Sequence, residues 1–186
     1  MLTTADADLL VTRHLGDTPR ANHSRLVGYI MRQLSGMFSA PADLWEVVGL
    51  CHDLDFFQTS HDWSQHGPLT VKWLGDRIPP DAQQAIAAHD HRTGIHADTL
   101  LADMLRAADA IAVIDEKLGR RSFCDMDQAA PFMTLRIQLG DRSYLSDILE
   151  RYLKKYDLSF AGIVKVVIHA PEQEPHLRQP DRKGNA

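Results

Sequence analysis

Apolar residues recur at helical spacing along almost the whole chain, and the alternation typical of strands is scarce. Prolines stand where they can begin a helix without losing a hydrogen bond, as at Pro19 and Pro41. The pattern predicts an all-α protein. Its expected helices cover residues 4–15, 19–38, 41–55, 67–77, 82–89, 98–118, 122–138 with a break at Pro131, 142–157 and 159–169.

Two local signals refine these expectations. Asp81 and Gln84 have the spacing of a capping box, in which each side chain bonds the other's backbone at a helix start. The run VKVVI at 164–168 could also be a strand by composition, but without a partner strand a helix is preferred. A single domain over residues 1–170 is expected, followed by a disordered tail at 171–186 that is rich in proline and charge.

Size and charge narrow the class of protein. A chain of 186 residues fits one domain, and a net charge of −5 with no arginine- or lysine-dense run argues against a nucleic acid polymer as partner. A small nucleotide as substrate stays open. Two distant cysteines, no apolar run of 18 residues and a polar start predict a cytoplasmic protein with no membrane partner.

Histidine is the unusual component, because the chain has ten and six of them lie between residues 52 and 96. Several chemically active side chains fall on the apolar stripes of expected helices, where core residues belong. These are His23, His66, His89 and Asp109. The pair His52–Asp53 closes the third expected helix, where both side chains could reach one ion.

Each of these residues also has an ordinary explanation. A single buried histidine is more often a hydrogen-bonded core residue than a ligand, and a lone His–Asp pair is common by chance. Asp109 could pair with Arg106 or Arg13. A metal explains several buried histidines and aspartates on separate helices together, because an unpartnered buried carboxylate is costly.

The segments NHSRLV, GLCHDLD and LRAADAI resemble the H…HD…D signature of the HD superfamily of metal-dependent phosphohydrolases. The resemblance spans about residues 20–120 and implies an HD-domain-like helical bundle. It also implies that one metal is held by His23, His52, Asp53 and Asp109.

Two further segments, HGPLTVKWL and AIAAHDH, are similar to those that add a second metal in a subgroup of small hydrolases and, more distantly, in bacterial dinucleoside tetraphosphate hydrolases. The likeness implies His66 and His89 as added ligands, with Asp53 as the bridge; His91 could exchange roles with His89. The implied cofactor is one or two divalent ions, among Mn, Fe, Co, Ni, Mg or Zn.

The expected activity is hydrolysis of a small phosphoester or nucleotide. Many family members carry a lysine in an HDxxK motif, but here the segment is HDLDFF, so that lysine's role does not transfer. Asp53 and His89 are candidate catalytic residues. Arg92, Lys72 or His61 could supply the missing donor, although each also fits an ordinary surface position.

Two rival functions fit the same resemblance. Some relatives with six such ligands hold two irons and activate O₂, and others keep the fold as non-catalytic signalling modules. The chain after Leu118 matches no motif. It could cover the site or form the interface of a homodimer.

Overall fold

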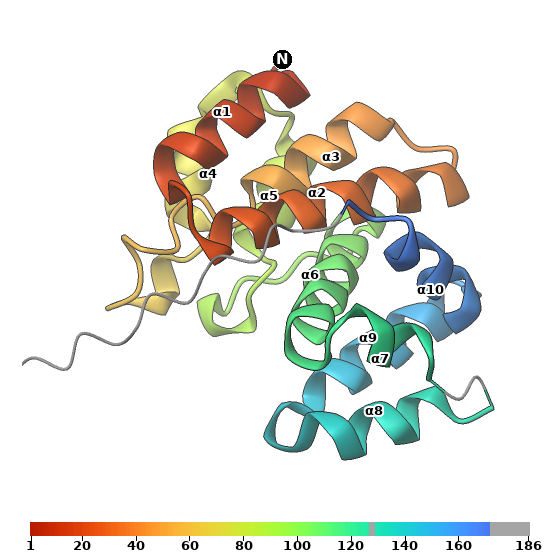
Figure 1. Ribbon diagram of the computed structural model, residues 1–186. Coiled ribbons are helices and arrows are strands. Elements are labelled where there is room, and N and C mark those ends of the chain that lie inside the picture. The colour runs from red at the N-terminus through yellow and green to blue at the C-terminus, as the bar shows by residue number, and fades with distance from the viewer. Residues whose placement is uncertain (127–128, 172–186) are drawn as a thin grey trace, which may run out of the picture.

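The computed structural model describes residues 1–126 and 129–171, and all regular structure in these ranges is helical (Figure 1). Except for Pro171, the tail expected to be disordered lies outside the described residues. The α-helices are α1 Thr4–Leu15, α2 Pro19–Met37, α3 Ala42–Cys51, α4 Pro68–Leu74, α5 Pro80–Ala87, α6 Leu100–Leu118, α7 Arg120–Cys124, α8 Pro131–Leu139, α9 Tyr144–Lys155 and α10 Phe160–Ile168.

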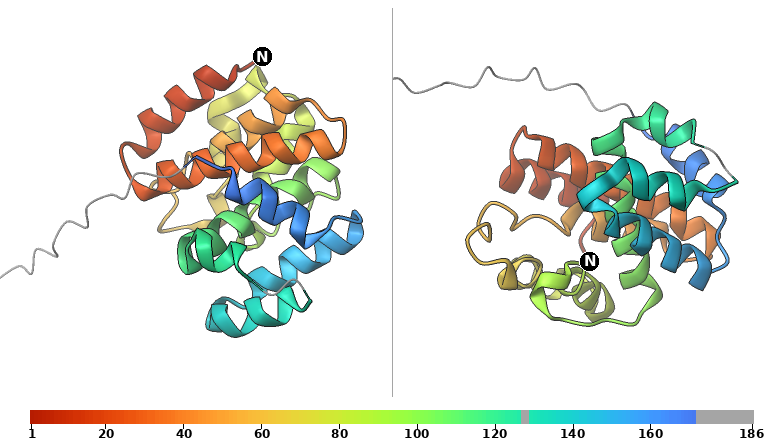
Figure 2. Two further views of the ribbon diagram at one scale, coloured as in Figure 1. Left: turned by 45° about the vertical axis from the view of Figure 1, so that its right-hand side comes forward. Right: turned by 90° about the horizontal axis from the view of Figure 1, so that it is seen from below.

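Helix α6 lies between two groups of helices. It packs against α2, α3 and α5 on one side and against α7, α8 and α9 on the other. Figures 1 and 2 show α1–α5 gathered in one half of the molecule and α7–α10 in the other, with α10 also touching α2. The expected all-α bundle is confirmed, and α6 is its central helix.

Helix starts follow local capping chemistry. The side chains of Thr3, Thr18 and Thr99 accept backbone N–H groups at the starts of α1, α2 and α6. The capping box expected at Asp81 is wrong, because α5 begins at Pro80 and Asp81 therefore lies inside the first turn. Its carboxylate accepts the N–H of Ala82 instead.

The other local differences concern where helices end. Helix α3 ends at Cys51, four residues earlier than expected, so that His52 caps the helix. The segment expected as one interrupted helix at 122–138 forms α7 and α8. The run VKVVI is helical, within α10, as preferred.

Two glycines set the contact between α2 and α3. A Cβ atom added at Gly49 would lie 2.7 Å from the Cα of Gly28 and 2.8 Å from the carbonyl oxygen of Val27. The two helices therefore touch backbone to backbone at this point. The two helices run in opposite directions (Figure 1). His23 near the start of α2 and His52 at the end of α3 therefore come together, with ring centroids 5.4 Å apart.

We predict that Gly49→Ala destabilises the protein by roughly 1–3 kcal/mol, because the new methyl group must push two backbones apart. Gly36→Ala is the matched control, since that helical glycine has nothing within 4 Å of an added Cβ. The control is expected to be stabilising by about 0.5–1 kcal/mol. Urea unfolding of both variants measures the difference, and equal free energies of unfolding would contradict the backbone contact.

Candidate metal centre

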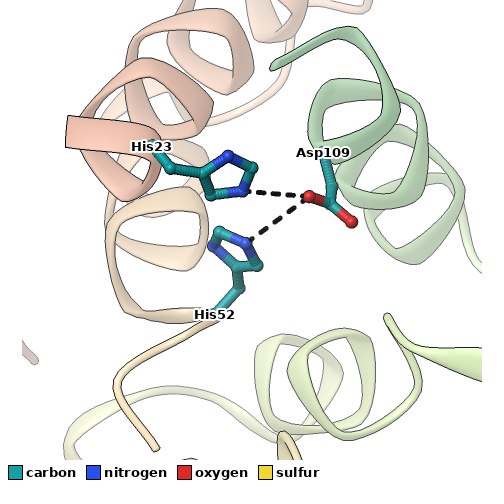
Figure 3. Close-up of side chains that lie close together, drawn as sticks. All are labelled: His23, His52 and Asp109. Carbon is teal, nitrogen blue, oxygen red and sulfur yellow. Dashed lines mark hydrogen bonds and ion pairs between the residues drawn. The ribbon is translucent and has the colours of Figure 1, made fainter. Parts of the chain in front are cut away.

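Three side chains from three helices meet inside the bundle. His23 comes from α2, His52 from the end of α3 and Asp109 from α6, and Figure 3 shows both rings pointing at the carboxylate. The Nε2 atom of His23 lies 3.0 Å from Oδ1 of Asp109, and that of His52 lies 3.9 Å from the same oxygen. Both histidines are fully buried, whereas the side chain of Asp109 is 31% exposed, toward a cavity described below.

Asp53 lies between two pairs of histidines. Its Oδ2 atom is 3.4 Å from Nε2 of His52 and 3.8 Å from Nε2 of His23. Its Oδ1 atom is 3.0 Å from Nε2 of His66 and 3.5 Å from Nε2 of His89. Each carboxylate oxygen therefore faces its own pair of imidazoles.

The second pair of histidines comes from turns rather than from helix faces. His66 precedes α4 and His89 follows α5, which corrects the expectation that both belong to those helices, although both are buried. Between His66 and α4, Gly67 has a φ of +90°, and a Cβ there would lie 2.5 Å from the carbonyl oxygen of Ile86. This close approach lets the turn lie against α5 and brings the Nε2 atoms of the two histidines to 3.2 Å.

All four imidazoles are oriented by a hydrogen bond at the outer nitrogen. In each ring Nδ1 contacts an oxygen at 2.7–2.8 Å, and Nε2 faces the centre. An Nδ1–H donated outward leaves the Nε2 lone pair available for a metal ion. The outer oxygens belong to the side chain of Glu116 for His23, the backbone of Gly49 for His52, the side chain of Asp55 for His66 and the backbone of Ile86 for His89.

The charges in the centre favour a cation. Burial opposes a positive charge on His23, but its hydrogen bonds to Asp109 and Glu116 outweigh burial and raise its pKa to about 10. Burial likewise opposes a charge on His66, yet hydrogen bonds to Asp53 and Asp55 raise its pKa to about 9. Protons thus occupy inner positions that a metal ion would take, and metal binding would release them.

His52 gives the sharpest test of whether a metal fits. Burial lowers its pKa to about 4, so the ring is neutral. Its Nδ1 bonds the carbonyl of Gly49, and its Nε2 atom is buried without any hydrogen-bond partner. A buried, unpartnered lone pair aimed at two carboxylates is what a metal ligand presents before the ion binds. Two groups of residues have ligand atoms close enough to hold an ion: His23, His52 and Asp109, and His52, Asp53 and His89.

A cavity of about 1060 Å³ opens onto the centre, and Asp53, His66, His89 and Asp109 line its floor. The guanidinium groups of two arginines in its wall lie over aromatic rings. The guanidinium of Arg20 lies 4.1 Å from the ring centroid of Phe56 and is 2.9 Å from Oδ2 of Asp53. The guanidinium of Arg92 lies 3.9 Å from the ring centroid of Trp63 and pairs with Asp90.

A family model described as HD domain matches residues 20–114, which is more than half of the chain. The chain belongs to the HD-domain family. The match covers His23, the His52–Asp53 pair and Asp109, so the resemblance read from the motifs is confirmed. Comparisons with curated proteins and with solved structures find no match. No helix in the described part of this HD domain is long and apolar enough to cross a membrane.

The other residues singled out in the sequence do not join the centre. Lys72 is exposed on α4 and does not line the cavity, and His61 is exposed in the loop before α4. His91 lines the outer cavity, but its side chain is 82% exposed, so His89 holds the inner position. Asp109 does not pair with Arg106, which instead bonds two backbone carbonyls and Asp103.

Three residues of the centre were missed in the sequence. Arg20, Asp55 and Glu116 contact Asp53, His66 and His23 respectively. Helical spacing could have found one of them, because Arg20 precedes His23 by one turn. Asp55 follows Asp53 by two residues, and Glu116 lies two turns after Asp109 on α6, but neither spacing shows which histidine the carboxylate contacts.

We predict that His52→Ala and Asp53→Ala each lose the bound metal while the helical content is kept. His52 supplies the unpartnered nitrogen and Asp53 faces all four histidines, so neither has a substitute. Elemental analysis with circular dichroism measures both properties. His91→Ala is the control and is expected to keep the full metal content. Full metal content in the His52 or Asp53 variant would refute the assignment.

We also predict that Glu116→Ala weakens metal binding by about 10–100-fold, because His23 loses the acceptor that orients its ring. Glu116→Gln should fall between this variant and the wild type, since an amide oxygen still accepts the Nδ1–H. Competition with a metal chelator gives the affinities. Glu150→Ala removes a comparable carboxylate that, within the described residues, pairs with Arg136 and Lys154. An equal loss in that control would contradict the role of Glu116.

Proposed function

We propose that this HD domain is a metal-dependent hydrolase of a small phosphoester or nucleotide. One observation carries the proposal: four outward-bonded imidazoles surround Asp53 at the floor of a cavity whose wall holds two fixed arginines. Groups that can bind a metal ion therefore lie next to arginines that can bind a phosphate. Catalysis of phosphoryl transfer uses both.

The arrangement of Asp53 supports a centre for two ions. His23, His52 and Asp109 would hold one ion and His66 with His89 the other, with Asp53 offering one oxygen to each. Bound divalent ions would polarise the phosphoryl group and lower the pKa of the attacking water. Asp53 itself would orient that water.

His89 fits the role of a ligand better than that of a free acid or base. Its Nδ1 bonds the carbonyl oxygen of Ile86, and its Nε2 faces Asp53 and His66. Both ring nitrogens are therefore engaged, and no proton on this ring is available to a leaving group.

Arg20 and Arg92 would take the part that lysine plays in the HDxxK relatives. A guanidinium stacked on an aromatic ring keeps its charge and its N–H donors, which match phosphoryl oxygens in geometry. Both arginines are also paired with carboxylates, so their orientation is set before substrate arrives. Fixed donors of this kind lose little entropy when they bind an anion.

The proposal is tested by loading the protein with Mn²⁺, Co²⁺, Ni²⁺, Mg²⁺ or Fe²⁺ and assaying phosphate release from a panel of nucleotides and phosphomonoesters. Phosphate release that depends on the metal is expected. No release with any of these ions would overturn the proposal. Stoichiometric iron after anaerobic purification, with O₂ consumption and no hydrolysis, would support the oxygenase alternative instead.

For a substrate found in this way, we predict that Arg92→Gln lowers kcat/KM by about a hundredfold, the usual cost of one preorganised donor. Lys72→Gln is the matched control, because Lys72 is an exposed cation outside the cavity. Steady-state kinetics with equal metal content in both variants makes the comparison. An unchanged kcat/KM in the Arg92 variant would exclude this arginine from phosphate binding.

A further inference from the structure

Helix α9 presents one continuous stripe to the cavity. Tyr144, Ile148, Arg151 and Lys155 all line the cavity, and their spacing of four, three and four residues places them on one face of the helix. The stripe extends for roughly 16 Å, given a rise of about 1.5 Å per residue. This wall comes from the part of the chain that lies beyond the segment matched to the HD domain.

The cations of this wall differ in whether they already have a partner. Lys155 is paired with the buried carboxylate of Asp103 at 2.7 Å, and that carboxylate also accepts the hydroxyl of Tyr156 at 2.8 Å. Arg151, and Arg142 just before the helix, line the same cavity. Within residues 1–126 and 129–171, neither makes a side-chain hydrogen bond or an ion pair.

Two acidic groups near α9 are already paired with other cations. Asp147 also lines the cavity, but Arg136 holds it at 2.8 Å. Asp103 is shared between Lys155 and Arg106. At the metal end, by contrast, each stacked arginine has its own carboxylate. Asp98 also lines the cavity, and Asp141 attracts Arg142 through space while it pairs with Lys117. Arg142 and Arg151 nevertheless bring two cations without an ion-pair partner among the described residues to the α9 end of the cavity.

We propose that the substrate carries a second anionic group, which Arg142 and Arg151 bind while its phosphoryl group lies at the metal centre. Tyr144 and Ile148 would contact the apolar or planar part between the two anionic groups. The inference rests on the proposed function only for the placement of the phosphoryl group at the metal centre. A cavity of about 1060 Å³ exceeds what a single phosphate group fills, so a two-ended ligand uses space that a simple monoester leaves empty.

The test uses metal-loaded protein and two series of probes that cannot be hydrolysed: alkylphosphonates and α,ω-alkane bisphosphonates of matched chain length. Titration calorimetry gives each Kd. At the chain length that spans the cavity, the bisphosphonate is expected to bind about tenfold or more tightly than the monophosphonate, as expected for a charged hydrogen bond. Equal affinity at every length would overturn the proposal, and so would failure of both series to bind.

Variants identify the second subsite. Arg151→Gln and Arg142→Gln are expected to remove most of the preference for the bisphosphonate and to leave the monophosphonate affinity unchanged. Lys154→Gln is the control, since this residue is also on α9 but is 74% exposed and does not line the cavity. Equal weakening of both probes in the arginine variants, or loss of the preference in the control, would overturn the assignment.

The outcomes separate this inference from the proposed function. The phosphonates report binding without turnover, so a preference for the bisphosphonate can be measured even if no phosphoester in the panel is hydrolysed. In that case the hydrolase proposal fails and the second anionic subsite stands. If panel substrates are hydrolysed but the bisphosphonate is not preferred, the hydrolase proposal stands and the second anionic subsite fails.

Discussion

The candidate metal centre depends on the hydrogen bonds that orient each imidazole at its outer nitrogen. A free histidine ring can turn and can carry its proton on either nitrogen, but here an oxygen bound to Nδ1 removes both freedoms. Two of these oxygens are backbone carbonyls one turn back along the chain, at Gly49 and Ile86. The other two are carboxylates. The Nε2 atoms on the inner face of the bundle are therefore oriented before any ion binds. Without the outer hydrogen bonds, burying these polar rings would be costly.

The packing of the helices places these rings together. The backbone contact of Gly28 with Gly49 fixes how α2 and α3 cross, and Gly67 lets the turn before α4 reach α5. Helix α6 then closes the group with Asp109 and Glu116, which lie two turns apart on the same face. Residues far apart in the sequence thus share one small volume because a few positions lack a side chain.

Sequence patterns predicted the helices and the residues of the centre better than they predicted local detail. Helical spacing located α1, α2, α6 and α10 closely, because each has a clear apolar face and a recognisable start or end. His66 and His89 were named as ligands but placed in helices, since periodicity cannot show that a helix stops just short of a residue. Their role as ligands stays a prediction.

The contacts of the outer partners and the helices that wall the cavity could not be predicted, because both depend on how separate helices pack together. Glu116 reaches His23 from another helix, and Arg20 meets Asp53 only after α2 packs on α3. The chain after Leu118 carried no motif, yet α9 lines the cavity. A motif consists of residues that lie close together in the sequence, whereas the shape of a cavity depends on residues that are far apart in it.

The position of α9 beyond the segment that bears the candidate ligands has a consequence for how such a domain can diversify. The residues that would hold the ions lie within residues 20–114, whereas the α9 wall begins beyond Leu118. Lys155 of α9 shares Asp103 with Arg106 of α6, but substitutions at distant positions with no shared partner act nearly additively on stability. Substitutions at cavity-facing positions of α9 that have no partner on α6, such as Arg151, would therefore change what the cavity accepts without changing the residues of the centre. Among related chains, substitutions in the C-terminal third would then change which ligand is preferred, whereas the first two thirds would keep the residues of the centre.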